Sequence, residues 1–278
     1  SVAICTDSTI ELRSCDVQVA FDAVTGMLRG VRSADREVPF NNGPVAIGMK
    51  MRFDPSRSGV RNTPEGAVFC ARYRGGVDSI VWRLTPGGLL EMKALLLNRA
   101  SGGGGFDDAF TDTEVYNLGF SFSYPETSCT GMRWLGRGPY RVWKNRIEGT
   151  RHGIWHKVYN DTVTGESFEN LVYPEFKGYH AGLYWATLES DTAPWSVHAL
   201  SDGIFLRIFT PREPDGRQED TMPAFPAGDI SFLLDIPAIR SFKPIEQQGP
   251  GSQPGNIRIK KGDEGLHIDL MFDFRQKK

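Results

Sequence analysis

One segment of the chain concentrates side chains that suit contact with a sugar. It reads Arg-Trp-Leu-Gly-Arg-Gly-Pro-Tyr-Arg-Val-Trp-Lys-Asn-Arg and covers residues 133–146. Its two glycines and its proline predict a tight turn directly after a strand. The turn displays four candidate carbohydrate-binding residues: Tyr140, Trp143, Asn145 and Arg146. Aromatic rings stack on the apolar face of a sugar, and amide or guanidinium groups bind its hydroxyls, so these residue types predict carbohydrate recognition.

A structural role is the alternative for the same segment. Trp134 lies within the preceding strand and is expected in the core. Trp143 fits a core position as well as a binding position. In this interpretation Arg146 pairs with a buried carboxylate and fixes the loop.

A second group of candidate residues follows the first. Trp155 is a further candidate ring for a sugar, and Glu175 and His180 are candidate polar contacts. With His152 and His156, these side chains could supply an acid and a base near neutral pH, as the epimerisation of a sugar requires. Isolated histidines in aromatic-rich strands are more often hydrogen-bonded structural groups, so both interpretations stay open.

Metal, redox and nucleotide chemistry find no support in the sequence. The four cysteines form no Cys-x-x-Cys pair and have no histidine at a zinc-ligand spacing. We expect buried free thiols, with a Cys5–Cys15 disulfide as the alternative in an exported protein. The glycine run 101–105 lacks the Lys-Ser/Thr of a phosphate-binding loop. We therefore expect no metal and no cofactor.

The charge balance and the hydropathy of the chain limit the classes of partner that it can bind. The chain has 278 residues, and its 32 Lys and Arg nearly balance its 34 Asp and Glu. No general basic field is available for a phosphate backbone, so nucleic acid is not an expected partner. No apolar run approaches the roughly 18 residues that cross a bilayer, so no membrane partner is expected either. The 40% hydrophobic content predicts a sizeable core.

The elements that must position these residues are strands. Apolar and polar residues alternate along most of the chain, which predicts strands. No capped helical pattern of ten or more residues occurs, and the nearest helical candidate is a turn or two near 167–172. The 31 Gly and 17 Pro supply many turns. Predicted strands cover 17–21, 27–31, 45–53, 67–73, 80–84, 89–97, 115–124, 131–135, 153–159, 182–188, 196–200, 204–210, 230–236, 256–259 and 266–274.

Turn signals join some of these strands into hairpins. Thr-Pro-Gly-Gly at 85–88 predicts one hairpin, and residues 261–265 predict another that closes the chain. The polar stretch between 53 and 67 is expected to be a loop. No linker interrupts the pattern, so residues 1–278 are expected to form a single large β-sandwich domain.

The segment Trp-Leu-Gly-Arg-Gly-Pro, at 134–139, followed by Arg146, resembles the C-terminal domain of family 2 glycoside hydrolases of the β-galactosidase type. Those domains carry Trp-x-Gly-x-Gly-Pro and then Asp-Arg. Three softer likenesses occur in the same order along the chain: an opening hairpin at 17–31, Tyr-Pro-Glu at 173–175 and a closing strand at 266–275. The resemblance therefore covers most of the chain.

This resemblance implies an all-β fold, a β-supersandwich of two large, mainly antiparallel sheets of the kind shared with galactose mutarotase. It also implies that the chain is the C-terminal part of a longer enzyme, whose acid and nucleophile lie in a separate (β/α)8 barrel. Retaining hydrolysis needs two carboxyl groups about 5 to 5.5 Å apart, which that barrel would supply. We accordingly assign no catalytic residue to this chain, and a periplasmic or secreted location is the expectation.

Two positions depart from the family pattern. Asn145 stands where the motif has Asp before Arg, so neutral hydrogen bonds replace a charged pairing. In the related β-galactosidases a Trp from the loop before the last hairpin reaches the sugar. Here the stretch 246–255 contains no aromatic residue, and Gln253 lies about where that Trp would be.

The leading hypothesis is a non-catalytic, carbohydrate-associated domain that packs on the catalytic barrel and helps shape the cleft for a galactoside-type glycan. One alternative is an aldose-epimerase-like enzyme with His180 as acid and Glu175 as base. Another is an autonomous carbohydrate-binding module that uses Tyr140, Trp143 and Trp155 as stacking platforms.

Overall fold

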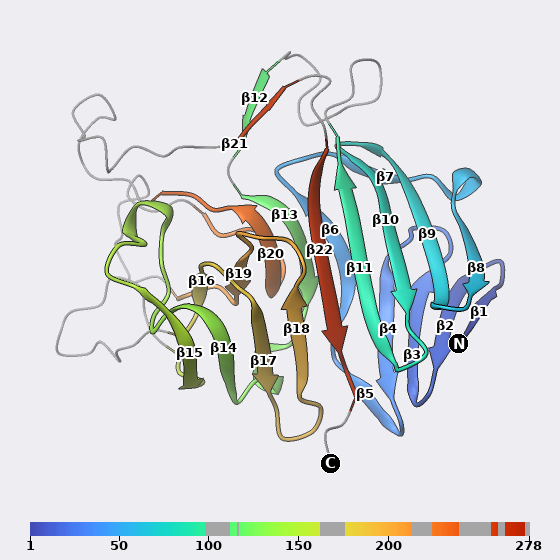
Figure 1. The fold of residues 1–278 in the computed structure, drawn as a ribbon, viewed down its shortest axis with the longest axis horizontal. Helices are drawn as coiled ribbons and strands as arrows, with labels where there is room; N and C mark the ends of the chain where they lie inside the picture. Colours follow the sequence, from blue (N-terminus) through green and yellow to red (C-terminus); the bar gives the residue numbers. More distant parts are fainter. Residues whose placement is uncertain are drawn as a thin grey trace.

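A computed structural model describes residues 1–97, 117–161, 176–212, 224–238 and 265–275, together with two short strands at 112–115 and 257–260. Two ten-stranded sheets make up the fold, and every described strand pair is antiparallel. In the view of Figure 1 the second sheet lies in front of the first. No helix in the described part of the chain is long and apolar enough to cross a membrane. The prediction of an all-β fold with two large antiparallel sheets is confirmed.

The first sheet has the strand order β1 (Val2–Cys5), β2 (Thr9–Ser14), β3 (Val17–Asp22), β4 (Leu28–Ser33), β6 (Asn41–Ile47), β13 (Leu118–Ser123), β20 (Ile230–Asp235), β19 (Phe205–Ile208) and β16 (Gly178–His180), with β5 (Arg36–Val38) on β4. The second has the order β15 (Arg151–Val158), β14 (Gly131–Gly138), β17 (Trp185–Glu189), β18 (Trp195–Ala199), β22 (Leu266–Asp273), β11 (Leu89–Leu96), β10 (Val77–Leu84), β9 (Gly66–Gly75) and β7 (Met51–Phe53), with β8 (Gly59–Thr63) on β9.

Smaller elements complete the description. Strands β12 (Asp112–Val115) and β21 (Ile257–Lys260) pair with each other apart from the two large sheets. Three single-turn 3-10 helices follow strands: η1 (Pro55–Arg57), η2 (Glu126–Ser128) and η3 (Lys144–Arg146). The predicted helical turn at 167–172 lies outside the described residues.

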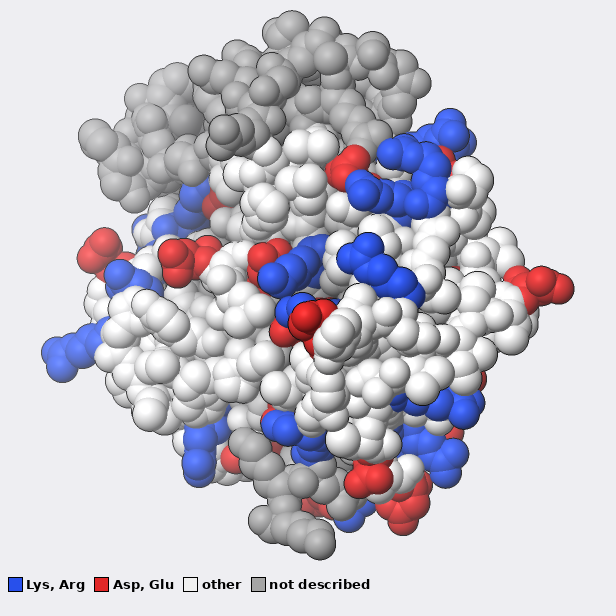
Figure 2. Space-filling model, turned by 45° about the vertical axis from the view of Figure 1, so that its right-hand side comes forward, with Lys and Arg blue, Asp and Glu red and all other residues white. Residues whose placement is uncertain are grey.

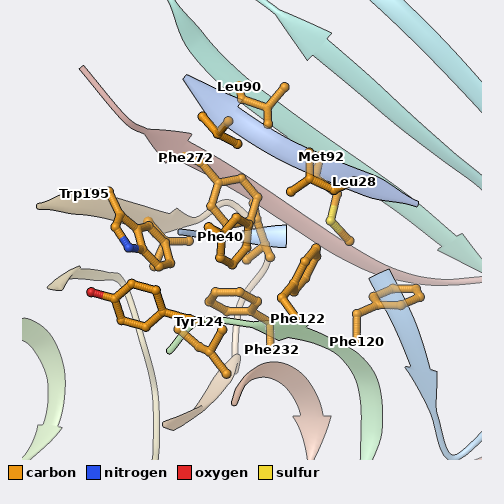
Figure 3. Close-up of a cluster of buried hydrophobic side chains, with 14 of the residues drawn as sticks. Leu28, Phe40, Leu90, Met92, Phe120, Phe122, Tyr124, Trp195, Phe232 and Phe272 are labelled. Atoms are coloured by element: carbon orange, nitrogen blue, oxygen red, sulfur yellow. The ribbon is translucent and has the colours of Figure 1, made fainter. Parts of the chain in front are cut away.

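The core lies between the two sheets, because each sheet turns alternate residues inward. In β22, for example, Ile268, Leu270 and Phe272 are buried, while the residues between them face outward. Phe40, just before β6, reaches the centre of the core. Its ring centroid lies 4.7 Å from that of Phe122 in the first sheet and 5.4 Å from that of Phe272 in the second (Figure 3). This aromatic contact joins the two sheets at their centre.

Most predicted strands are present, and the first predicted hairpin is confirmed by the pairing of β10 with β11. The closing hairpin is wrong, because β21 pairs with β12 whereas β22 lies between β11 and β18. The predicted strand 45–53 is two strands in different sheets, β6 and β7. The predicted loop after it contains η1 and β8. Local turn signals do not reveal which distant strand completes a sheet.

The cysteines differ from expectation. All four are free, and only Cys129 is buried; Cys5 and Cys15 are exposed, so the prediction of buried thiols is wrong for these two. Cys5 pairs with Ile10 at the start of β2, and Cys15 lies just beyond the end of that strand. At about 3.3 Å per residue their Cα atoms are roughly 17 Å apart, too far for a disulfide.

Charges of both signs are interspersed on the face of the molecule that Figure 2 presents. Within the second sheet, ion pairs join neighbouring strands, such as Arg83 with Glu91 and Arg72 with Asp78. Among the described residues, no group of three or more His, Cys, Asp or Glu is placed to hold a metal ion.

Candidate functional site

The loop that carries the sequence motif crosses from one sheet to the other. It leaves β14 at Gly138, in the second sheet, through a cis peptide bond to Pro139. The backbone amide of Val142 then donates to the carbonyl oxygen of Tyr179 in β16, at 2.8 Å. The amide of Lys144 donates to the carbonyl of Pro237 at 3.1 Å. The motif loop therefore closes one end of the sandwich.

A buried ion pair fixes this loop, but it is not the predicted one. The Nζ atom of Lys144 lies 2.5 Å from a carboxylate oxygen of Asp235, and both side chains are largely shielded from solvent. Arg146 is exposed and donates to the carbonyl oxygen of Asn145 at 2.9 Å. The expected pairing of Arg146 with a buried carboxylate is thus wrong, and Lys144 has that role.

Trp143 lies in a small hydrophobic cluster beside the main core. It is 6% exposed, and its ring centroid lies 5.5 Å from that of Tyr179 and 5.2 Å from that of Phe225. Val142, Ala181 and other apolar residues complete the cluster. A sugar could stack on Trp143 only if this cluster opened. Tyr140 and Asn145 are half-buried, so they lie nearer the surface of the same loop.

Trp155 and Gly138 depend on each other. A Cβ atom at Gly138 would lie 2.5 Å from the Trp155 ring, so only glycine permits the indole to pack there. The indole Nε1 donates to the carbonyl oxygen of Gly136 at 3.2 Å. Trp134, opposite Trp155 in the β14–β15 pair, is fully buried, which confirms its predicted core position. The glycines of the motif thus provide space for an aromatic layer.

His180 is buried beside Trp134, with ring centroids 5.1 Å apart. Its Nε2 lies 3.1 Å from the carbonyl oxygen of Phe176, so Nε2 carries the proton and donates, and Nδ1 has no partner among the described residues. Burial, together with the positive charges of Lys157 and Arg141, lowers the pKa of His180 to about 4, although the hydrogen bond to Phe176 acts in the opposite direction. The imidazole is therefore neutral at pH 7.

Lys157 is the residue that sequence reasoning missed. It points inward from the edge strand β15, is buried, and its Nζ has no hydrogen-bond partner within the described ranges of the chain. Burial alone lowers the pKa of this amine to about 7. The alternation of β15 would have placed Lys157 on the same face as Trp155, which was the available signal.

Two carboxylates near this end of the sandwich, Glu126 and Asp161, are engaged, whereas Glu148, just after η3, is exposed. Glu126 and Asp161 both pair with Lys177, whose hydrogen bond, with its charge, holds the pKa of Asp161 below its usual range. On the outer face, His156 lies 2.9 Å from a carboxylate oxygen of Glu189. A general acid needs a raised pKa near neutrality, and the contact with Lys177 has the opposite effect on the pKa of Asp161. Glu175 and Gln253 lie outside the described residues, so the predicted His180–Glu175 pair stays a prediction.

Comparisons with known proteins identify the family of the chain. Residues 68–210, just over half of the chain, match the family described as beta galactosidase small chain. A putative aldose 1-epimerase from Escherichia coli K12 is similar in structure, at 12% identity and a TM-score of 0.41, over 95% of this chain and 97% of that chain. No curated protein sequence matches. The family match includes the motif loop, Trp155, Lys157 and His180.

Proposed function

The chain belongs to the β-galactosidase small-chain family, and from this premise we propose that it is the non-catalytic C-terminal domain of a family 2 glycoside hydrolase. In this function it packs on the catalytic barrel and helps shape the cleft for a galactoside-type glycan. The hydrolytic acid and nucleophile then belong to the barrel.

The state of His180 is the observation that carries the non-catalytic part of the proposal. An acid that works near neutral pH must hold a proton there, whereas His180 has a pKa of about 4 and its Nε2 is engaged with the Phe176 carbonyl. The nearby carboxylates of Glu126 and Asp161 are paired with Lys177. A carboxyl group whose pKa is held low by a lysine, as that of Asp161 is, is a poor proton donor.

The construction of the motif loop supports a scaffolding role. Backbone bonds to Tyr179 and Pro237 and the Lys144–Asp235 pair hold it between the two sheets. A loop fixed in this way can present Tyr140, Asn145 and Arg146 at a constant position toward a neighbouring domain. Trp143 then packs beneath these three residues and supports the loop through its hydrophobic cluster.

Turnover of aryl β-galactosides tests the proposal. The chain alone should give no turnover above the uncatalysed rate, and the complete enzyme should be active. Activity of the chain alone that His180→Gln or Glu175→Gln abolishes would contradict the non-catalytic role. Full activity of the catalytic barrel without this chain would contradict the cleft-shaping role.

A further inference from the structure

The outer face of the second sheet carries a row of mostly apolar side chains. Strand register places Ile154, Leu135, Trp185, His198 and Met271 opposite one another across β15, β14, β17, β18 and β22. All five alternate with inward-facing core residues, so they point away from the core. Outer faces of antiparallel sheets in water are normally polar, which makes this row unusual.

Exposed apolar side chains gather at the β15 end of the row. Ile154 is 67% exposed and Val158, two register positions along the same face, is 69% exposed. Tyr184, next to Trp185, is 55% exposed, and its ring lies 6.0 Å from that of His152. On this face His156 separates Val158 from Ile154, so the apolar centre consists of Ile154 with Leu135 and Trp185. Exposed apolar side chains grouped in this way mark interaction sites. Tyr, Trp and Arg together are also the residues most enriched at interface hot spots.

Arginines border this apolar group without partners. Arg133 and Arg137 face outward from β14, and neither makes an ion pair or a side-chain hydrogen bond within the part of the chain that the structure describes. On the other half of the same sheet, Arg83 and Arg72 are paired with Glu91 and Asp78. In Figure 1 these halves are the left-hand strands β15, β14 and β17 and the right-hand strands β11, β10 and β9. The left half has one pair on this face, His156 with Glu189, and its two arginines have no partner among the described residues, which suits contact with another polypeptide.

Charge decides which partner fits. A second copy of this chain would meet the patch with the same patch, because a two-fold interface is self-complementary. Such an interface would bring the unpaired Arg133 and Arg137 of both copies together. Addition of a strand to the edge of β15 is also disfavoured, because Lys157 points inward from that edge strand. The patch therefore fits the face of a different polypeptide, with acidic side chains around an apolar centre.

We infer that this docking face, made of Arg133, Leu135, Arg137, Ile154, Val158, Tyr184 and Trp185, binds an acidic surface with an apolar centre on the catalytic part of the β-galactosidase. The inference rests on the proposed function, because it names the surface through which the domain packs on the barrel.

Hydroxyl-radical footprinting of the complete β-galactosidase tests the docking face. In the wild-type enzyme we expect Tyr184 and Trp185 to be protected from oxidation. Ile154→Asp should expose both rings and lower the turnover of an aryl β-galactoside about tenfold, as loss of an interface hot spot does. Val24→Asp is the matched control, since Val24 is 68% exposed but lies far from this face in the turn before β4; it should change neither readout.

Charge reversal tests the chemistry of the partner. Arg133→Glu and Arg137→Glu should each increase the oxidation of Trp185 in the complete enzyme, whereas Arg52→Glu, on β7, should not. Unchanged or stronger protection in the Arg133→Glu and Arg137→Glu variants would overturn an acidic partner.

Other results separate the two proposals. Free oxidation of Tyr184 and Trp185 in an active wild-type enzyme would overturn the docking face and leave the proposed function intact. Protection that increases with the concentration of the complete enzyme would place a second copy on this face and overturn the inference. Hydrolysis by the isolated chain would contradict the proposed function whatever the footprint shows.

Discussion

The backbone amide of Val142 donates to the carbonyl oxygen of Tyr179 at 2.8 Å, and this bond joins a loop of one sheet to the edge strand of the other. Val142 follows β14 in the second sheet, and Tyr179 is the central residue of β16 in the first. The side chains next to this bridge, Trp143 and His180, are buried as a result. The motif loop is thus a structural closure whose outer residues remain for contact with other surfaces.

Trp143→Ala should destabilise the domain by about 3 to 5 kcal/mol, because it removes an indole from a packed cluster and leaves a cavity. Urea unfolding followed by circular dichroism measures this change. Arg146→Ala, at an exposed position in the same loop, is the control and should change the free energy of unfolding by less than about 0.5 kcal/mol. A stable Trp143→Ala protein with lost glycan binding would instead support the stacking-platform hypothesis.

His180 should make the fold sensitive to acid. Its pKa is about 4 in the folded chain and 6.5 in the unfolded chain, so the unfolded state binds the proton more tightly. Above about pH 6.5 the imidazole is neutral in both states and does not lower the free energy of unfolding. As the pH falls from 6.5 toward 4, protonation of the unfolded state lowers the free energy of unfolding, by about 3 kcal/mol in total. Thermal unfolding of His180→Gln should be less dependent on pH over this window. Parallel curves for wild type and variant would refute the assignment.

Lys157→Met should stabilise the domain at neutral pH. The pKa of Lys157 is about 7 in the folded chain and 10.5 in the unfolded chain, so folding at pH 7 works against protonation of the amine. The resulting loss of free energy of unfolding is absent above about pH 10.5, grows as the pH falls to 7, and then stays constant at no more than about 5 kcal/mol. The difference in unfolding free energy between variant and wild type, measured from pH 7 to 10, should therefore shrink as the pH rises. A variant less stable than the wild type at pH 7 would show that the amine has a stabilising partner.

Arg207 should be among the least replaceable residues of the chain. It is fully buried, and its guanidinium donates to the carbonyl oxygens of Pro226, Ala227 and Gly228 and to the hydroxyl of Ser231. Arg207→Met would leave several of these acceptors without donors, at a cost of about 3 kcal/mol or more.

The matched variant for this site is Arg207→Lys, which keeps the charge. The single ammonium group of lysine cannot reach every oxygen that the planar guanidinium contacts, so lysine should restore only part of the lost stability. Chemical denaturation compares the two proteins. Full recovery by lysine would mean that charge, and not the geometry of the fork, holds the segment 226–228.

The sequence by itself determined the class of fold and the family. Alternation along β3 and β22 predicts inward and outward faces from local residues alone, and a turn such as 85–88 joins neighbouring strands. The motif at 134–139 predicted a β-galactosidase domain, which the family match confirms. Each of these signals is local, because periodicity and turn chemistry act over a few residues.

Only the tertiary structure decided the role of each side chain at the candidate site. The bridge between the loop after β14 and β16 buries Trp143 and His180, and the inward side of β15 leaves Lys157 without a partner among the described residues. The partner of Asp235 is Lys144, and not Arg146, because the loop places the lysine toward β20. The apolar row on the second sheet combines residues from 135 to 271 that no local pattern connects. Pairing of distant strands fixes burial, and burial in turn fixes both the charge of a group and the surface on which it lies.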